Sequence, residues 1–165
     1  MLRAATPGRV LSLKGRALRY LSQREHSRAE LARKLAPHAE SDEQLESLLS
    51  QLTSEGWLSD VRFAQSLIHR RSQRYGIRRI AAELATHGLE ACDQSTALAD
   101  LDRTEAQRAT DCWARRFKQA PQSSLERSKQ QRFLLQRGFT PEVIRLVLQR
   151  ANQTVSDPGP DEHSG

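Results

Sequence analysis

Six arginines stand between Val61 and Ala82, and no aspartate or glutamate lies among them. They are Arg62, Arg70, Arg71, Arg74, Arg78 and Arg79. A guanidinium group holds phosphate oxygens through paired hydrogen bonds and stacks on nucleobases, so it suits nucleic acid better than an ammonium group does. The whole chain has the same bias, with 22 arginines and four lysines. The segment therefore predicts contact with a polyanion, and the alternative is a solvated charged face that only maintains solubility.

Two amphipathic helices are expected to position these arginines. The first covers about 61–74 and follows Gly56, which can take the left-handed conformation that ends the preceding helix. Asp60 is expected to accept hydrogen bonds from the amides that open this first helix. The second helix covers 77–87, and Gly88 is placed to end it. Apolar residues recur at helical spacing in both segments, so each helix has one side that can be buried.

Basic side chains recur on other predicted helices. Arg16 and Arg19 lie on the first helix of the chain, and Arg115 and Arg116 lie near the end of a later helix. If successive helical units have similar orientations, these groups join the central arginines in an electrostatic track for a polyanion. The candidate contact residues are Arg16, Arg19, Arg70, Arg71, Arg74, Arg78, Arg79, Arg115 and Arg116.

A sequence motif in the same region resembles a known family. The segments that carry it are Gly56-Trp57-Leu58-Ser59-Asp60, Arg62-Phe63-Ala64, Gly76, Arg79-Ile80, Glu83-Leu84 and His87-Gly88-Leu89. They resemble the central motif of the RecX family, regulators of the RecA recombinase, and the resemblance extends from about 17–35 to 137–139. The family often has a second acid at Ser59 and a lysine at His87. Neither departure changes the apolar framework, although His87 weakens any contact that needs a permanent charge.

Composition favours an all-helical fold. Valine and isoleucine together number nine of 165 residues, whereas leucine, alanine, arginine, glutamine and glutamate are abundant, which suits helices and not sheets. Hydrophobic residues make up 37% of the chain, which suits small helical modules better than one deep core. The net charge of +6 and the isoelectric point of 10.0 favour nucleic acid, an acidic protein surface or a nucleoprotein as the partner.

The sequence also predicts what the protein lacks. No apolar run approaches the roughly 20 residues that a membrane span needs, and 1–13 has no pattern of a signal peptide, so we expect a cytoplasmic protein. Cys92 and Cys112 have no metal-ligand spacing, and the five histidines are scattered. No Gly-rich phosphate loop follows a strand. We therefore expect no metal, no cofactor and no enzymatic activity.

A triplet of helices recurs three times along the chain. When the second helices of the triplets are superposed, Leu35, Leu84 and Leu134 share one register. We expect an all-α fold of three tandem three-helix modules, at 13–56, 57–102 and 103–151. Because each module is too small to bury its apolar faces alone, the modules should stack into an elongated, curved body. A flexible N-terminal arm at 1–12 and a disordered tail at 152–165 flank them.

Local patterns predict helix starts and core positions within these modules. Three serine-led capping boxes open helices, in which the side chains of the first and fourth residues satisfy backbone amides. The pairs are Ser27 with Glu30, Ser41 with Gln44, and Ser123 with Glu126. Large aromatic residues are expected in the core because packing explains their positions. They are Trp57, Phe63, Trp113, Phe117, Phe133 and Phe139.

Two classes of function follow. The resemblance to RecX implies a monomeric binding protein that lodges in the RecA filament on single-stranded DNA and inhibits the recombinase. Homologous recombination, DNA repair and the SOS response would then be affected. The alternative is a helix-turn-helix transcription factor that reads one duplex sequence, formed by 27–35 and the helix after it. Against the alternative, the second helix of that pair carries Asp42, Glu43 and Glu46 and no basic residue.

Overall fold

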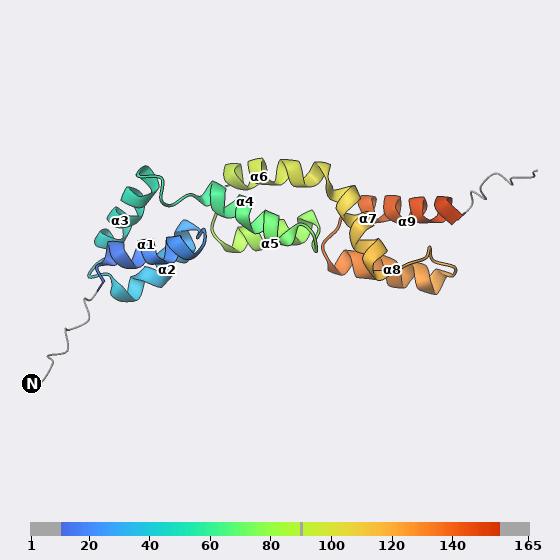
Figure 1. The fold of residues 1–165 in the computed structure, drawn as a ribbon, viewed down its shortest axis with the longest axis horizontal. Coiled ribbons are helices and arrows are strands. Elements are labelled where there is room, and N and C mark those ends of the chain that lie inside the picture. Colours follow the sequence, from blue (N-terminus) through green and yellow to red (C-terminus); the bar gives the residue numbers. More distant parts are fainter. Residues whose placement is uncertain (1–10, 90, 156–165) are drawn as a thin grey trace, which may run out of the picture. The chain divides into compact units, whose positions relative to one another are not determined.

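The computed structural model describes residues 11–89 and 91–155. In this part of the chain all regular structure is helical, with nine α-helices, one short 3₁₀ helix and no strand, which confirms the predicted all-α class (Figure 1). The elements are α1 (Leu13–Gln23), α2 (Arg28–Leu35), η1 (Ala36–His38), α3 (Asp42–Ser54), α4 (Asp60–Arg71), α5 (Ile77–Thr86), α6 (Ala91–Arg103), α7 (Glu105–Arg116), α8 (Ser124–Gln136) and α9 (Pro141–Val155). They form the three predicted triplets in chain order.

The described residues reach into both predicted ends of the chain. Most of the arm at 1–12 and of the tail at 152–165 lies outside the described residues. The last helix, α9, continues to Val155, past the predicted end of the third module at 151. The module boundaries and the elongated shape stay predictions.

The chain divides into two compact units, with the boundary after Phe63. In the first unit, α1, α2 and α3 enclose an aliphatic core, and Figure 1 shows them gathered together. Its buried members are Ala17, Leu31, Leu35, Leu45, Leu48, Leu49, Leu52 and Leu58. The leucines recur at helical spacing on α2 and α3, so one face of each helix supplies the core. His26 and Ser27, in the α1–α2 connection, are buried polar residues of this unit.

The second unit contains a core formed by α7, α8 and α9, in which α9 packs against both other helices. Its buried members are Ala109, Cys112, Leu134, Phe139, Ile144, Val147 and Leu148. Leu84 of α5 is also fully buried. Leu35, Leu84 and Leu134 are each 0% exposed, which confirms the predicted register of the second helices.

Serine side chains cap three helices as predicted. The Oγ atoms of Ser27, Ser41 and Ser123 accept hydrogen bonds from the amides of the residues three positions later, at 3.1 to 3.2 Å. The reciprocal bonds differ from a simple capping box, because Glu126 Oε2 accepts from the amide of Gln122, one residue before the cap. In the first unit the Glu30 carboxylate turns instead toward the Arg24 guanidinium.

Asp60 has a different role from the predicted one. Ser59 Oγ accepts the opening amide of Arg62 at 3.2 Å, so Ser59 caps α4. Asp60 Oδ1 accepts the backbone amide of Arg28 at 2.8 Å and so caps α2. A buried acid repeats this arrangement in the second unit, where Glu105 of α7 accepts the amide of Ile77, the first residue of α5, at 2.9 Å. An acid in the first turn of one triplet therefore caps the second helix of the preceding triplet.

Two glycines bring α5 and the α8–α9 turn into backbone contact within the second unit. Gly76 N donates to the carbonyl of Arg137 at 2.8 Å, and Arg78 N donates to that of Gly138 at 3.1 Å. A Cβ atom on Gly76 would lie 2.3 Å from the Gly138 carbonyl oxygen. Since real Cβ atoms do not approach so closely, this contact requires glycine at 76. The contact fixes the start of α5, which carries Arg78 and Arg79, against the third triplet.

Most predicted core aromatics are buried or partly buried, with Phe63 and Phe139 at 1% and 0% exposure. Trp57 is the exception. It is 55% exposed, so its assignment to the core is wrong. Its neighbour Leu58 takes the buried position beside α2 and α3, at 2% exposure.

Candidate nucleic-acid interface

Two of the six central arginines are neutralised by acids from outside the segment. Arg71 Nη2 lies 2.9 Å from Glu83 Oε1, and Arg62 Nε lies 2.8 Å from Glu25 Oε1. The Glu83 carboxylate raises the pKa of Arg71 through hydrogen bonds and charge attraction. Of the six arginines, Arg62 and Arg71 are therefore already paired with acids. Glu83 lies on α5 and Glu25 lies in the α1–α2 connection, so it is the fold that brings these acids to the two arginines.

Arg70 and Arg78 are two open members of the central group. Both are exposed, and among the described residues neither side chain makes a hydrogen bond or ion pair. Arg79 is exposed too, but its guanidinium lies 4.2 Å from the centre of the Tyr75 ring, and Nη1 donates to the Gln136 carbonyl at 3.3 Å. A guanidinium on an aromatic face keeps its charge while its plane is held in one orientation.

Other predicted contact residues converge on a single pocket. This four-arginine pocket has a volume of about 440 Å³ and lies in the second unit, between the turn after α4 and helices α7 and α8. It is lined by Arg74, Tyr75, Cys112, Arg115, Arg116, Phe133 and Arg137. None of these described lining residues is acidic. The structure thus brings Arg74, Arg115 and Arg116 together as a cluster of positive charge.

Arg137 is the member of the pocket that the sequence analysis missed. Its Nη1 donates to the carbonyl of Arg74 at 3.4 Å, and its guanidinium lies 4.4 Å from the centre of the Phe133 ring. The signal available in the sequence was its place directly before Gly138, whose positive φ of 82° ends α8. A basic residue at such a helix end interacts favourably with the free carbonyls there.

Two further arginines of the pocket are also held by neighbouring groups. Arg115 Nη2 donates to the carbonyl of Gln73 at 2.6 Å. The Arg116 guanidinium lies 5.5 Å from the centre of the Phe117 ring. Carbonyl oxygens and ring faces thus orient these guanidiniums without removing their charge, which leaves N–H groups free for a ligand.

Basic groups continue from the four-arginine pocket into two adjoining hollows. Arg116 and Phe133 also line a hollow of about 250 Å³ with Lys129 and Arg132. Arg116 and Lys129 in turn line a third, of about 440 Å³, together with Lys118 and Glu126. Because neighbouring hollows share lining residues, the three hollows adjoin one another along α7 and α8. Only the third hollow has an acidic lining residue among those described.

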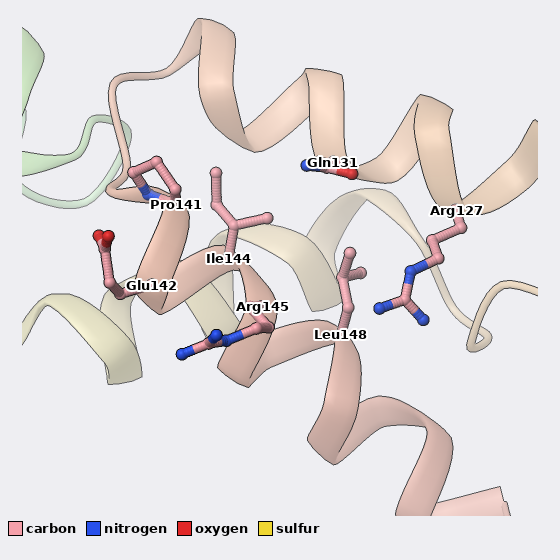
Figure 2. Close-up of a pocket in the computed structure, with 7 residues that line it drawn as sticks. All are labelled: Arg127, Gln131, Pro141, Glu142, Ile144, Arg145 and Leu148. Carbon is pink, nitrogen blue, oxygen red and sulfur yellow. The ribbon is translucent and has the colours of Figure 1, made fainter.

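A separate pocket lies between α8 and α9 and has a different character (Figure 2). It has a volume of about 370 Å³, and Figure 2 shows Ile144 and Leu148 of α9 turned toward α8. Arg127 and Arg145 contribute positive charge, but Glu142 is also among the lining residues. This pocket therefore combines an apolar floor with mixed charge, so it is a weaker candidate for an anion.

Arg108 fixes the turn that carries the pocket's first arginine. From α7 its Nη1 donates to the carbonyls of Ser72 and Tyr75 at 3.1 and 2.9 Å, and its Nη2 donates to that of Leu101 at 2.8 Å. Burial lowers the pKa of Arg108, yet the group stays a cation because an arginine pKa is so high. Arg108 therefore positions Arg74 and is not available to a ligand.

The remaining predicted contacts, Arg16 and Arg19, lie on α1 in the first unit. Arg19 is exposed and Arg16 is partly exposed.

In the described part of the chain, no group of three or more histidine, cysteine, aspartate or glutamate side chains is placed to hold a metal ion. None of the described helices is both long and apolar enough to cross a bilayer. Cys112 is a free, buried thiol, and the side chain of Cys92 lies outside the described residues.

The fold and the basic surface define an all-helical protein built from repeated three-helix domains. Three domain descriptions of one family match it in order: "RecX, first three-helix domain" at 14–52, the second at 59–98 and the third at 104–148. Regulatory protein RecX of Ralstonia nicotianae is 50% identical over 153 residues, which cover 93% of this chain and 96% of that protein. The chain belongs to the RecX family of regulatory proteins.

Other relatives agree with this assignment. Regulatory protein RecX of Leptothrix cholodnii is 50% identical over 142 residues, which cover 86% of this chain and 90% of that protein. The crystal structure of RecX from Lactobacillus salivarius has the same fold, with a TM-score of 0.75, 20% identity, and coverage of 86% of this chain and 95% of that chain. The transcription-factor alternative is not favoured by these relatives. Its proposed recognition helix, α3, is acidic, and Glu46 of that helix pairs with Arg28 at 2.6 Å.

Proposed function

We propose that this protein binds the RecA filament on single-stranded DNA and inhibits the recombinase. The observation that carries the proposal is the four-arginine pocket, which has no acidic residue among its described lining, in a chain of the RecX family. Such a pocket attracts phosphates, and phosphates recur at regular intervals along filament DNA. Contact with the DNA backbone does not depend on base sequence, so the protein can act anywhere on a filament.

The proposed contact surface includes exposed arginines outside the pocket. Arg70, Arg78 and Arg79 of the second unit belong to it, and Arg16 and Arg19 on α1 are separate proposed contacts of the first unit. The protein acts as a monomer in the cytoplasm, with no cofactor and no catalytic activity of its own. By limiting RecA it lowers homologous recombination and DNA repair by strand exchange, and it dampens the SOS response.

A reconstituted reaction tests the proposal. The full-length protein is titrated into RecA on circular single-stranded DNA, and ATP hydrolysis and strand exchange are followed together. Both rates should fall as the protein is added. Unchanged rates, combined with tight binding to one duplex sequence, would support the transcription-factor alternative instead.

A second measurement distinguishes contact with the filament DNA from contact with the RecA protein surface. Binding of the protein to single-stranded DNA alone should weaken steeply with added salt, because cation contacts to phosphates release condensed counterions. If inhibition persists at salt concentrations that abolish binding to free DNA, the RecA protein surface is the main contact.

A further inference from the structure

We infer that the four-arginine pocket is a binding site for one backbone phosphate of single-stranded nucleic acid. This inference rests on the proposed function and specifies its contact at the level of residues. The pocket joins the second and third triplets within one compact unit, because Arg74 follows α4 whereas Arg115, Arg116 and Arg137 come from α7 and from the end of α8. No single helix could assemble it.

Two of the four guanidiniums in the pocket are held in place before any ligand binds. Arg115 is anchored on the Gln73 carbonyl, and Arg137 is anchored on the Arg74 carbonyl and the Phe133 ring. Each guanidinium has five N–H donors, so one anchoring bond leaves most donors free. Holding these long side chains in place in advance lowers the entropy lost on binding. Like charges gathered without an acid also repel one another, and a bound anion relieves that repulsion.

A phosphate fits this pocket better than an acidic peptide does. The Arg79 guanidinium lies over one face of the Tyr75 ring, and the Arg137 guanidinium lies over the Phe133 ring. The aromatic surface is thus used to hold guanidiniums, whereas a protein partner would need open apolar area for its anchoring side chains. The positive surface also continues past Arg116 to Lys129 and Arg132, as an extended chain of phosphates requires.

Two double variants with the same charge change test the site. Arg74→Gln with Arg116→Gln removes two pocket cations whose side chains make no hydrogen bond among the described residues. Arg127→Gln with Arg145→Gln removes two exposed cations from the α8–α9 pocket of Figure 2 and serves as the control. Circular dichroism and thermal unfolding establish that both variants fold like the wild type.

The readout is the affinity for a fluorescent oligodeoxythymidylate across a series of salt concentrations. The pocket variant should bind about tenfold more weakly at low salt, the loss expected for one charge-assisted hydrogen bond. Its slope of log affinity against log salt should flatten by about 0.7, the value for one phosphate contact on a single strand. The control variant should stay within about threefold of the wild type, as expected for loss of long-range attraction alone.

Three outcomes would overturn the inference. Equal losses in the two variants would show that only total charge matters. A folded pocket variant with wild-type DNA affinity would exclude the site. Weaker binding to polyglutamate with unchanged binding to the oligonucleotide would assign the pocket to an acidic protein.

The same variants distinguish this inference from the proposed function. If the wild type does not inhibit RecA, the proposed function fails, although the pocket can still be assayed on free DNA. If the pocket variant binds free DNA like the wild type and still inhibits RecA, the phosphate site fails while the proposed function stands.

Discussion

His26 is a buried histidine with both ring nitrogens hydrogen-bonded. It is 1% exposed, its Nδ1 donates to the Arg24 carbonyl at 2.9 Å, and its Nε2 accepts from Lys34 Nζ at 3.0 Å. Burial lowers the pKa of His26 below its ordinary value. Beside it, the Arg24 guanidinium holds the pKa of Glu30 at about 2. Protonation of either group therefore opposes the folded state of the first unit.

Stability should accordingly fall as the pH is lowered. Near pH 6.5 the unfolded chain takes up a proton at His26 that the folded chain refuses, so the free energy of unfolding decreases below that pH. The contribution of Glu30 is complete above about pH 4.5 and is lost as the pH falls toward its folded value of about 2. Urea unfolding at several pH values between 7 and 5 measures the decrease in the free energy of unfolding that His26 causes, which forms one step in the pH dependence. His26→Gln should flatten that step, whereas replacement of the exposed His38 should preserve it, and a stability that rises toward pH 5 would contradict the assignment.

Gly56 and Gly138 both end helices with a positive φ, of 78° and 82°, but their surroundings differ. A Cβ on Gly56 would meet nothing within 4 Å, whereas a Cβ on Gly138 would lie 2.6 Å from the backbone nitrogen of Arg79. Gly56→Ala should therefore cost about 1 to 2 kcal/mol, the strain of a left-handed residue. Gly138→Ala should cost about 1 to 3 kcal/mol more, because the crowded backbone must also shift. Denaturant unfolding of both variants makes the comparison, and equal losses would show that the contact at Gly138 is easily relaxed.

Single residues also mark the limit of prediction from sequence. The density of arginines was visible, but the partner of Arg71 lies on the next helix, and only folding brings Glu83 to it. Arg137 was overlooked for the same reason, since the other pocket arginines are distant in the chain. Trp57 was assigned to the core because packing explained its position, whereas its neighbour Leu58 is the buried residue. Hydrophobicity alone does not determine which of two adjacent apolar residues points inward.

At the scale of elements, helix positions were well predicted because their signals are local. Serine caps and helix-ending glycines each depend on residues within a few positions of one another. Asp60 shows where such reasoning fails. Its sequence position suggests a cap for its own helix, yet the carboxylate caps α2, which begins 32 residues earlier. The geometry of the junction between triplets determines which helix Asp60 caps, and no local sequence pattern indicates that geometry.

The buried junction acid Glu105 should stabilise the fold mainly through its hydrogen bonds. Glu105 is 1% exposed, and its two oxygens accept from the amide of Ile77 and the hydroxyl of Thr140. Glu105→Ala should cost about 1 to 3 kcal/mol, because the Ile77 amide loses its partner in a buried place. Glu105→Gln should retain most of the stability, since the amide oxygen still accepts and the amide nitrogen can donate to Thr140. Thermal unfolding compares the two, and a glutamine variant as unstable as the alanine variant would show that charge matters.

At the scale of the whole molecule, positive charge is divided between paired and open groups. The net charge of +6 counts paired and unpaired cations alike. A contact with a DNA phosphate that releases condensed counterions needs a cation that no acid already neutralises. Arg70 and Arg71 are adjacent at the end of α4, and they differ in whether an acid pairs with them. Arg70 is exposed and makes no ion pair among the described residues, whereas Arg71 is bound by Glu83.

The neighbouring pair allows the proposed DNA contact to be tested with minimal change to the molecule. Arg70→Gln should flatten the slope of log affinity for single-stranded DNA against log salt by about 0.7, because one phosphate contact is lost. Arg71→Gln should leave that slope near the wild-type value, although the unpaired Glu83 will reduce affinity at low salt by repulsion. Glutamine and arginine have similar helix propensities, so circular dichroism should show both variants folded. Inhibition of RecA should weaken with Arg70→Gln if the filament DNA is the contact. If the two variants have the same salt slope, the charge on α4 acts only as a solvated surface, and the DNA contact must lie elsewhere on the chain.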